Sequence, residues 1–338
     1  VRSMSPGLAI ISASMLVADA PTGLHMTPAP GRQLQAGASC TPRDSFVHVG
    51  FDMAKLVRSN LGGQGGRCTT AGFCVEQLTA STPQEILFET VGVARTGEPI
   101  DMRVTNTSEY RAWNIKLNGI KSQKKGDKTG YFGVINLLGP RSTSQRGGQW
   151  KTEFTHVELK FELLGRWTRT PITLDRTFMT FYDFDTGRPR FDASNSQVEI
   201  MQAGPEASTV YLSPNTELTQ YNTWQSYLAP SAFASFMESN PVTWSSKINV
   251  ASSYGIGNDN PYSPYDLTEL QKARSVMAEF NNVNTFHVRF AIGQCCTTGR
   301  NFLFAGYSPL HLPLCPKPPS SPPQPPPPVP PPPSPPPS

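Results

Sequence analysis

Two aspartates separated by one residue, Asp183 and Asp185, form the pattern in this chain that is most typical of a metal site. They follow a run of strand-forming residues, and alternate side chains of an extended chain point to the same side, so both carboxylates can face one ion. Calcium prefers clustered oxygen ligands of this kind, and Glu199 or Asp175 could supply more of them. Ser194 stands where an EF-hand loop would need glutamate. Two interpretations stay open, a calcium site and an aspartate-rich turn.

Other residue types that catalyse reactions are dispersed along the chain. There is no Gly-x-Ser-x-Gly elbow, no His-Glu-x-x-His motif and no cysteine in a papain-like context. Residues 62–67 are rich in glycine but lack the Lys-Ser/Thr pair of a phosphate-binding loop, which favours a flexible hairpin loop. His156 and His287 fall in strand-like runs, where a structural role is favoured. We therefore expect a protein that is not an enzyme.

The tryptophans offer aromatic faces on which a sugar ring could stack, although such side chains more often pack in the core of a β-sandwich. They are Trp113, Trp150, Trp167, Trp224 and Trp244. A calcium-dependent surface lectin or adhesin is therefore an alternative function. It would need a solvent-facing tryptophan beside the acidic pair.

Six cysteines predict three disulfides, because their number is even and their spacing matches no zinc motif. They are Cys40, Cys68, Cys74, Cys295, Cys296 and Cys315. Cys68 and Cys74 could pair locally, Cys40 and Cys315 could close the domain, and the full connectivity stays open. Disulfides indicate an oxidising compartment and hence a secreted, extracellular protein. The sequon at Asn106 predicts N-glycosylation and agrees with secretion.

Charge and hydropathy exclude two classes of partner. The net charge is +4 with 16% charged residues, which is too mild for a nucleic-acid binder. Four lysines, at positions 121, 124, 125 and 128, fall in a glycine-containing turn and are interpreted as part of a solvated loop. No apolar run reaches the length of about 18 residues that a membrane-spanning helix requires, so no membrane span is expected.

Strand-like runs dominate the middle of the chain and predict an all-β fold, a disulfide-stapled sandwich or jelly roll. The runs are 46–51, 85–93, 100–105, 112–117, 131–138, 156–164, 177–184, 197–201, 209–212, 231–237, 242–252, 285–292 and 301–305. In the run 156–164, apolar residues alternate with Glu158, Lys160 and Glu162, which predicts one wet face. One amphipathic helix of about 13 residues is expected after Asp266 as N-cap, with Glu269 completing a capping box.

Three regions follow from these patterns. Residues 1–39 are predicted to form an extended N-terminal arm and linker, residues 40–315 the β-sandwich head as one large or two fused sandwiches, and residues 316–338 a polyproline II tail. The tail holds 16 of the 34 prolines. Proline fixes φ and lacks a backbone donor, so such a run forms an extended rod of roughly 70 Å, at about 3.1 Å per residue.

The Ser-Pro-Pro blocks of the tail, from Ser321 to Ser338, resemble those of hydroxyproline-rich glycoproteins of the extensin and pherophorin type, which belong to plant and green-algal walls, matrices and flagellar surfaces. The resemblance is confined mainly to the tail. It implies prolyl hydroxylation and O-linked arabinose or galactose. The residues concerned are Pro318, Pro319, Pro322, Pro323, Pro325, Pro326, Pro327, Pro328, Pro330, Pro331, Pro332, Pro333, Ser334, Pro335, Pro336 and Pro337.

Together these observations predict a secreted structural glycoprotein, a subunit of an extracellular matrix, cell wall or surface filament. Its expected partners are further copies of itself, in an oligomer or filament, and other matrix glycoproteins or glycans.

Overall fold

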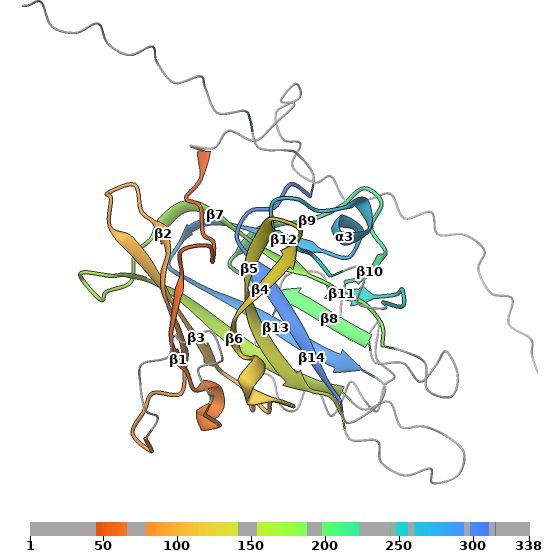
Figure 1. Cartoon of the computed structure of the whole chain (residues 1–338), viewed down its shortest axis with the longest axis horizontal. Helices are drawn as coiled ribbons and strands as arrows, with labels where there is room; N and C mark the ends of the chain where they lie inside the picture. The colour runs from red at the N-terminus through yellow and green to blue at the C-terminus, as the bar shows by residue number, and fades with distance from the viewer. Residues whose placement is uncertain are drawn as a thin grey trace, which may run out of the picture. The chain divides into compact units, whose positions relative to one another are not determined.

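The computed structural model describes residues 45–65, 79–140, 154–187, 198–222, 244, 248–255, 260–293, 298–310 and 315 (Figure 1). The chain divides into two compact units, Val1–Gly37 and Ala38–Ser338, and all described residues belong to the second. The predicted arm and the predicted rod lie outside the described residues. In the part of the chain that is described, no helix is long and apolar enough to cross a membrane.

The described residues form two β-sheets in which all neighbouring strands are antiparallel, which confirms the all-β class. The eight-stranded sheet has the order β1-β2-β3-β6-β13-β8-β11-β10 (Figure 1). Its strands are β1 (Lys55–Ser59), β2 (Ile86–Val93), β3 (Pro99–Asn106), β6 (Phe154–Gly165), β13 (Thr285–Gly293), β8 (Val198–Ala203), β11 (Ile248–Ala251) and β10 (Leu218–Tyr221).

The six-stranded sheet has the order β4-β5-β14-β7-β12-β9. Its strands are β4 (Gly119–Lys125), β5 (Lys128–Leu138), β14 (Gly299–Ala305), β7 (Leu174–Tyr182), β12 (Val276–Val283) and β9 (Ala207–Leu212). The lysines expected in a solvated loop lie on the hairpin of β4 and β5. Since β4 is an edge strand of the described sheet, its Lys121, Lys124 and Lys125 oppose pairing with the edge of another sheet.

The core lies between the two sheets and is built largely from phenylalanine. The ring of Phe304 on β14 lies 5.4 Å from that of Phe161 on β6 and 6.2 Å from that of Phe88 on β2, all fully buried. Phe302 on β14 stacks on Phe290 of β13, with ring centroids 4.3 Å apart. Gly133 stands opposite Phe304 in the neighbouring strand, where a Cβ would lie 2.4 Å from the ring. Glycine therefore leaves the space that this ring fills.

The alternation in β6 places its apolar residues in the core as predicted: Val157, Leu159, Phe161 and Leu163 are fully buried. The prediction of a wet opposite face is wrong at Glu158, which is 3% exposed. Arg289 of β13 stands directly across from Glu158 and pairs with it, and the Trp244 ring lies over the Arg289 guanidinium. The opposite face is therefore covered at this point. Lys160 and Glu162, further along the strand, are half-buried.

The predicted helix is shorter and begins later than its sequence pattern indicated. Helix α3 (Glu269–Ala273) has Thr268 as its N-cap, and Thr268 forms the capping box with Gln271. Asp266 instead forms an ion pair with Lys128, 2.5 Å apart. The apolar residues expected on the second half of the helix belong to β12, which pairs with β7 and β9 on its two sides.

Two predicted strands are wrong. Residues 115–117 form a 3-10 turn, Ile115–Leu117. The run 46–51 forms only an isolated bridge, because its backbone makes hydrogen bonds to both sheets and joins neither as a strand. Val47 N–H donates to Arg176 O of β7, and Gly50 N–H donates to Val91 O of β2. Its apolar residues are buried between the sheets, which explains their strand-like pattern. The predicted strand 231–237 lies outside the described residues.

Candidate functional site

The two predicted calcium ligands lie just beyond the C-terminal end of β7. Asp183 has a left-handed backbone, with φ 68°, and turns the chain after the strand. Asp185 is 5% exposed, and its backbone N–H donates to Glu199 Oε2 on β8 at 3.1 Å. The structure thus brings Glu199 beside Asp185. Asp175 lies near the opposite end of β7, with its carboxylate 3.4 Å from Arg95 Nε.

Arg300 of β14 supplies positive charge to this acidic cluster, and the sequence patterns did not indicate it. Its Nη1 lies 3.2 Å from Asp185 Oδ1 and its Nε 3.6 Å from Glu199 Oε1. Burial raises the pKa of Glu199 well above its ordinary value, and Asp185 and Asp183 add to the shift against the opposing effect of Arg300. The cluster can therefore hold a proton on Glu199.

A calcium ion here would compete with the Arg300 guanidinium for the Asp185 carboxylate. Among the described residues, no group of three or more His, Cys, Asp or Glu side chains is arranged to hold a metal ion. The calcium site at Asp183 and Asp185 stays a prediction.

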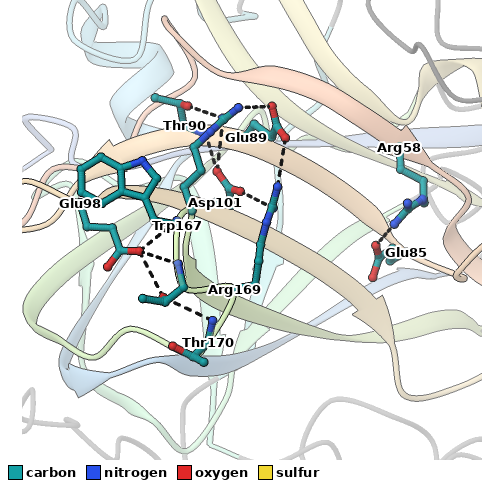
Figure 2. Close-up of polar contacts among 11 residues, drawn as sticks. Arg58, Glu85, Glu89, Thr90, Glu98, Asp101, Trp167, Arg169 and Thr170 are labelled. Atoms are coloured by element: carbon teal, nitrogen blue, oxygen red, sulfur yellow. Dashed lines mark hydrogen bonds and ion pairs between the residues drawn. The ribbon is translucent and has the colours of Figure 1, made fainter.

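A second cluster surrounds the buried carboxylate of Asp101 on β3 (Figure 2). Arg169 Nη1 donates to Asp101 Oδ2 at 2.8 Å, and Thr90 N–H donates to Asp101 Oδ1 at 2.9 Å. Arg166 donates to Thr90 Oγ1 at 2.8 Å and to Glu89 Oε2 at 2.7 Å. Burial raises the pKa of Asp101 above its ordinary value despite the Thr90 hydrogen bond and the two guanidinium groups.

The turn after β6 is fixed to this cluster and carries Trp167. Three donors converge on Glu98 Oε1: Trp167 N–H and Thr168 N–H at 3.1 Å, and the Thr168 hydroxyl at 3.2 Å. At Gly165, a Cβ would lie 2.4 Å from both Glu98 Oε1 and Thr168 Oγ1, so a larger residue would displace these two side chains. Figure 2 shows Glu98, Trp167 and Thr170 beside the pair formed by Asp101 and Arg169.

The acidic cluster and the Trp167 turn lie at opposite ends of β6. Val198, next to Glu199, is in register with Gly293, which is in register with Phe154 at the start of β6. Trp167 follows Gly165 at the other end of this twelve-residue strand. At about 3.3 Å per residue, the two sites are roughly 35 to 40 Å apart. Trp167 is therefore not the tryptophan beside the acidic pair that the lectin alternative requires.

A third cluster of polar side chains connects three neighbouring strands of the eight-stranded sheet, β6, β13 and β8. Arg289 of β13 donates to Glu158 Oε1 from Nη2 at 2.5 Å and from Nε at 3.1 Å, and to Gln202 Oε1 at 3.0 Å. The Trp244 ring lies 4.3 Å from the guanidinium carbon. His156, two residues before Glu158, is half-buried, and burial together with Arg289 lowers its pKa to about 4. His156 is therefore neutral at neutral pH.

Replacing His156 with glutamine is expected to flatten the pH dependence of stability between about pH 4 and 6.5. The pKa of His156 is about 4 in the folded chain, whereas an unfolded histidine titrates near pH 6.5. As the pH falls below 6.5, the unfolded chain binds a proton that the folded chain excludes, so the free energy of unfolding falls. We expect wild type to lose about 2 to 3 kcal/mol from this group by pH 4.

Urea denaturation of wild type and His156→Gln at pH 7, 5.5 and 4 measures this effect. The difference between the two proteins isolates His156 from the carboxylates that titrate in the same range. Equal losses of stability in both proteins would show that His156 is not responsible.

The remaining predicted residues fall at scattered places. Asn106 is the last residue of β3, half-buried, with its side-chain amide donating to Ser108 O at 2.8 Å. Trp113 and Trp167 are exposed, whereas Trp150 and Trp224 lie outside the described residues. Cys315 is disulfide-bonded. The other five cysteines lie outside the described residues, so the connectivity stays a prediction.

Comparison with known proteins assigns the chain to no family: no family model and no curated protein matches it. Solved structures with some similarity include the adhesin domain of PrgB from Enterococcus faecalis bound to DNA, with 6% identity and a TM-score of 0.35 over 65% of this chain and 66% of that one. The glucan-binding protein C of Streptococcus mutans has 9% identity and a TM-score of 0.35 over 71% of this chain and 65% of that one.

The N-terminal domain of the Streptococcus gordonii adhesin Sgo0707 has 11% identity and a TM-score of 0.33, over 66% of this chain and 46% of that one. The chain thus spans less than two thirds of the length of each of these three proteins. Likenesses at these scores carry no argument about the function of this chain.

Proposed function

We propose that this protein is a secreted structural glycoprotein, a subunit of an extracellular matrix, cell wall or surface filament. Its β-sandwich head carries a glycosylated polyproline II rod. The observation that carries the proposal is the position of the tail: the proline run 316–338 begins directly after Cys315, which is disulfide-bonded. A disulfide between Cys315 and a cysteine of the head would attach the base of the rod to it covalently.

The physical properties of such a tail suit a mechanical role. A polyproline II chain has no internal hydrogen bonds, keeps its backbone solvated and resists shortening, so it spaces the units that it joins. Hydroxylation and O-linked sugars, which the resemblance to extensins and pherophorins implies, would stiffen and solubilise it. The head has two large sheets around one aromatic core, and it would give each rod a rigid end. Heads and glycosylated rods of several copies would then assemble into an oligomer or filament.

The proposal is tested by the mass and composition of the tail in the native protein. The protein is purified from its source and cleaved, and the C-terminal peptide is analysed by mass spectrometry before and after chemical deglycosylation. We expect a mass above that of the unmodified sequence, which falls on deglycosylation to a value that still includes one oxygen for each hydroxyproline. A C-terminal peptide with the mass of the unmodified tail sequence would overturn the glycoprotein-rod proposal.

A further inference from the structure

Trp167 exposes its indole ring from a turn that the fold holds in place. The residue is 71% exposed, while its own backbone N–H and that of Thr168 are bound to Glu98. We propose that this turn is a binding site for a neutral sugar ring, which stacks on the face of the indole. This binding function goes beyond the structural role proposed above and does not depend on a modified tail.

The backbone around the site is held in unfavourable conformations. Arg169 and Thr90 both have left-handed backbones, with φ 57° and 56°, although neither is glycine. Both are bonded to the buried carboxylate of Asp101, one through its guanidinium and the other through its backbone N–H. Left-handed residues with a Cβ persist where the surroundings fix them, and they concentrate at binding sites. The Asp101 carboxylate thus links β2, through Thr90, to the Trp167 turn, through Arg169.

Such a turn is preorganised for binding. Glu98 accepts three hydrogen bonds from residues 167 and 168, so the turn has little backbone freedom to lose when a ligand binds. An indole adds a large contact area with only two side-chain torsions to order. The ordering cost that usually weakens binding to surface loops is therefore small here.

The charges around Trp167 favour a neutral ligand. Within the described part of the chain, two arginines and three carboxylates lie in the turn or are bonded to it. They are Arg166, Arg169, Glu89, Glu98 and Asp101. Both arginines pair with Glu89 and Asp101, and Glu98 adds a further carboxylate, so the site has no excess positive charge to attract a sulfate, phosphate or uronate. The guanidinium of Arg169 is more than half exposed and can hydrogen-bond hydroxyl groups.

The size and polarity of the surroundings favour a sugar over an apolar protein surface. Residues 167–171 are all exposed, and Trp167 is the only large apolar side chain among them. A single aromatic ring among the polar residues of its own turn is smaller than the contiguous apolar patch of a protein interface. A pyranose or furanose ring has C–H groups on one face and hydroxyls at its edge, which match the indole and the polar rim.

Affinity electrophoresis tests the proposal with the full chain. Native gels contain soluble galactan, arabinan or mannan, with dextran sulfate as the charged comparison. We expect at least one neutral polysaccharide to retard wild type and Trp167→Ala to weaken that binding by about tenfold or more, as for a central aromatic contact. Trp167→Phe keeps an aromatic face and should retain part of the affinity. Glu98→Ala removes the acceptor of all three hydrogen bonds and should lower affinity by loosening the turn while leaving the indole in place.

Trp113→Ala is the matched control, because Trp113 is also exposed but lies beside Gly299, at the end of the head away from the Trp167 turn. It should bind like wild type. Since Trp167 is exposed, Trp167→Ala should also unfold at the same urea concentration as wild type. The proposal is overturned if no neutral polysaccharide retards the protein, if only dextran sulfate does, or if Trp167→Ala binds as well as wild type.

Discussion

Replacing Phe304 with alanine is expected to lower the free energy of unfolding by about 3 to 5 kcal/mol, the usual cost of removing a large ring from a packed core. Phe304 is fully buried, and its ring contacts aromatic rings from both sheets and from the segment that bridges them. These rings are Phe51, Phe88, Phe161 and Phe181. A cavity at this point removes contacts between the two sheets, so little of it can be filled by local movement.

Equilibrium denaturation in urea measures this change. Phe304→Leu is the control, because it keeps most of the side-chain volume and should cost about 1.5 kcal/mol or less. If alanine costs no more than leucine, the ring is not part of a tightly packed centre.

Replacing Glu158 with alanine is expected to cost about 3 to 5 kcal/mol, because it leaves the Arg289 charge buried without its carboxylate. The side chains of Arg289 and Glu158 are 3% and 4% exposed, so water cannot replace the lost partner. The double variant Glu158→Leu with Arg289→Met removes both charges and should recover much of the loss. Urea denaturation of the single and double variants gives both values.

The same strand provides a matched control. Glu162 of β6 also stands directly across from an arginine, Arg103 of β3, but the Arg103 side chain is 36% exposed. Glu162→Ala should therefore cost about 1 kcal/mol or less, since water can solvate the guanidinium that remains. Similar losses at positions 158 and 162 would contradict the argument that burial decides the value of these pairs.

The strand β6, which alternates in polarity, could be predicted from the sequence, whereas β12 was wrongly predicted as part of a helix. The core-facing residues of β6 follow a period of two, and the prediction is confirmed there. Residues 276–280 of β12 are buried at every position, so both faces of the strand are covered there. A continuous apolar run has no period that distinguishes a strand from a helix. Because neighbouring apolar residues fall at helical spacing, a helix was wrongly predicted here.

Only the part of each site that is local in sequence could be predicted. Asp183 and Asp185 lie close together in the chain, and Glu199 is one of the two further acidic residues that the sequence offers as ligands. Arg300 reaches the same cluster from β14, and no sequence spacing indicates that contact. The Trp167 turn depends on strand register: β2, β3 and β6 bring Glu89, Asp101 and Arg166 together. Register of this kind follows from the tertiary fold and is not evident in a single sequence.

The strand order also determines when the head can fold during synthesis. The last two strands among the described residues, β13 and β14, are interior strands: β13 lies between β6 and β8, and β14 between β5 and β7. A nascent chain that has not yet produced them has two halves of each sheet with nothing to join them. The N-terminal strands therefore cannot complete their sheets until β13 and β14 have been synthesised. Contacts so distant in sequence form slowly, so we infer that the head folds as one unit, and only once β14 has been synthesised.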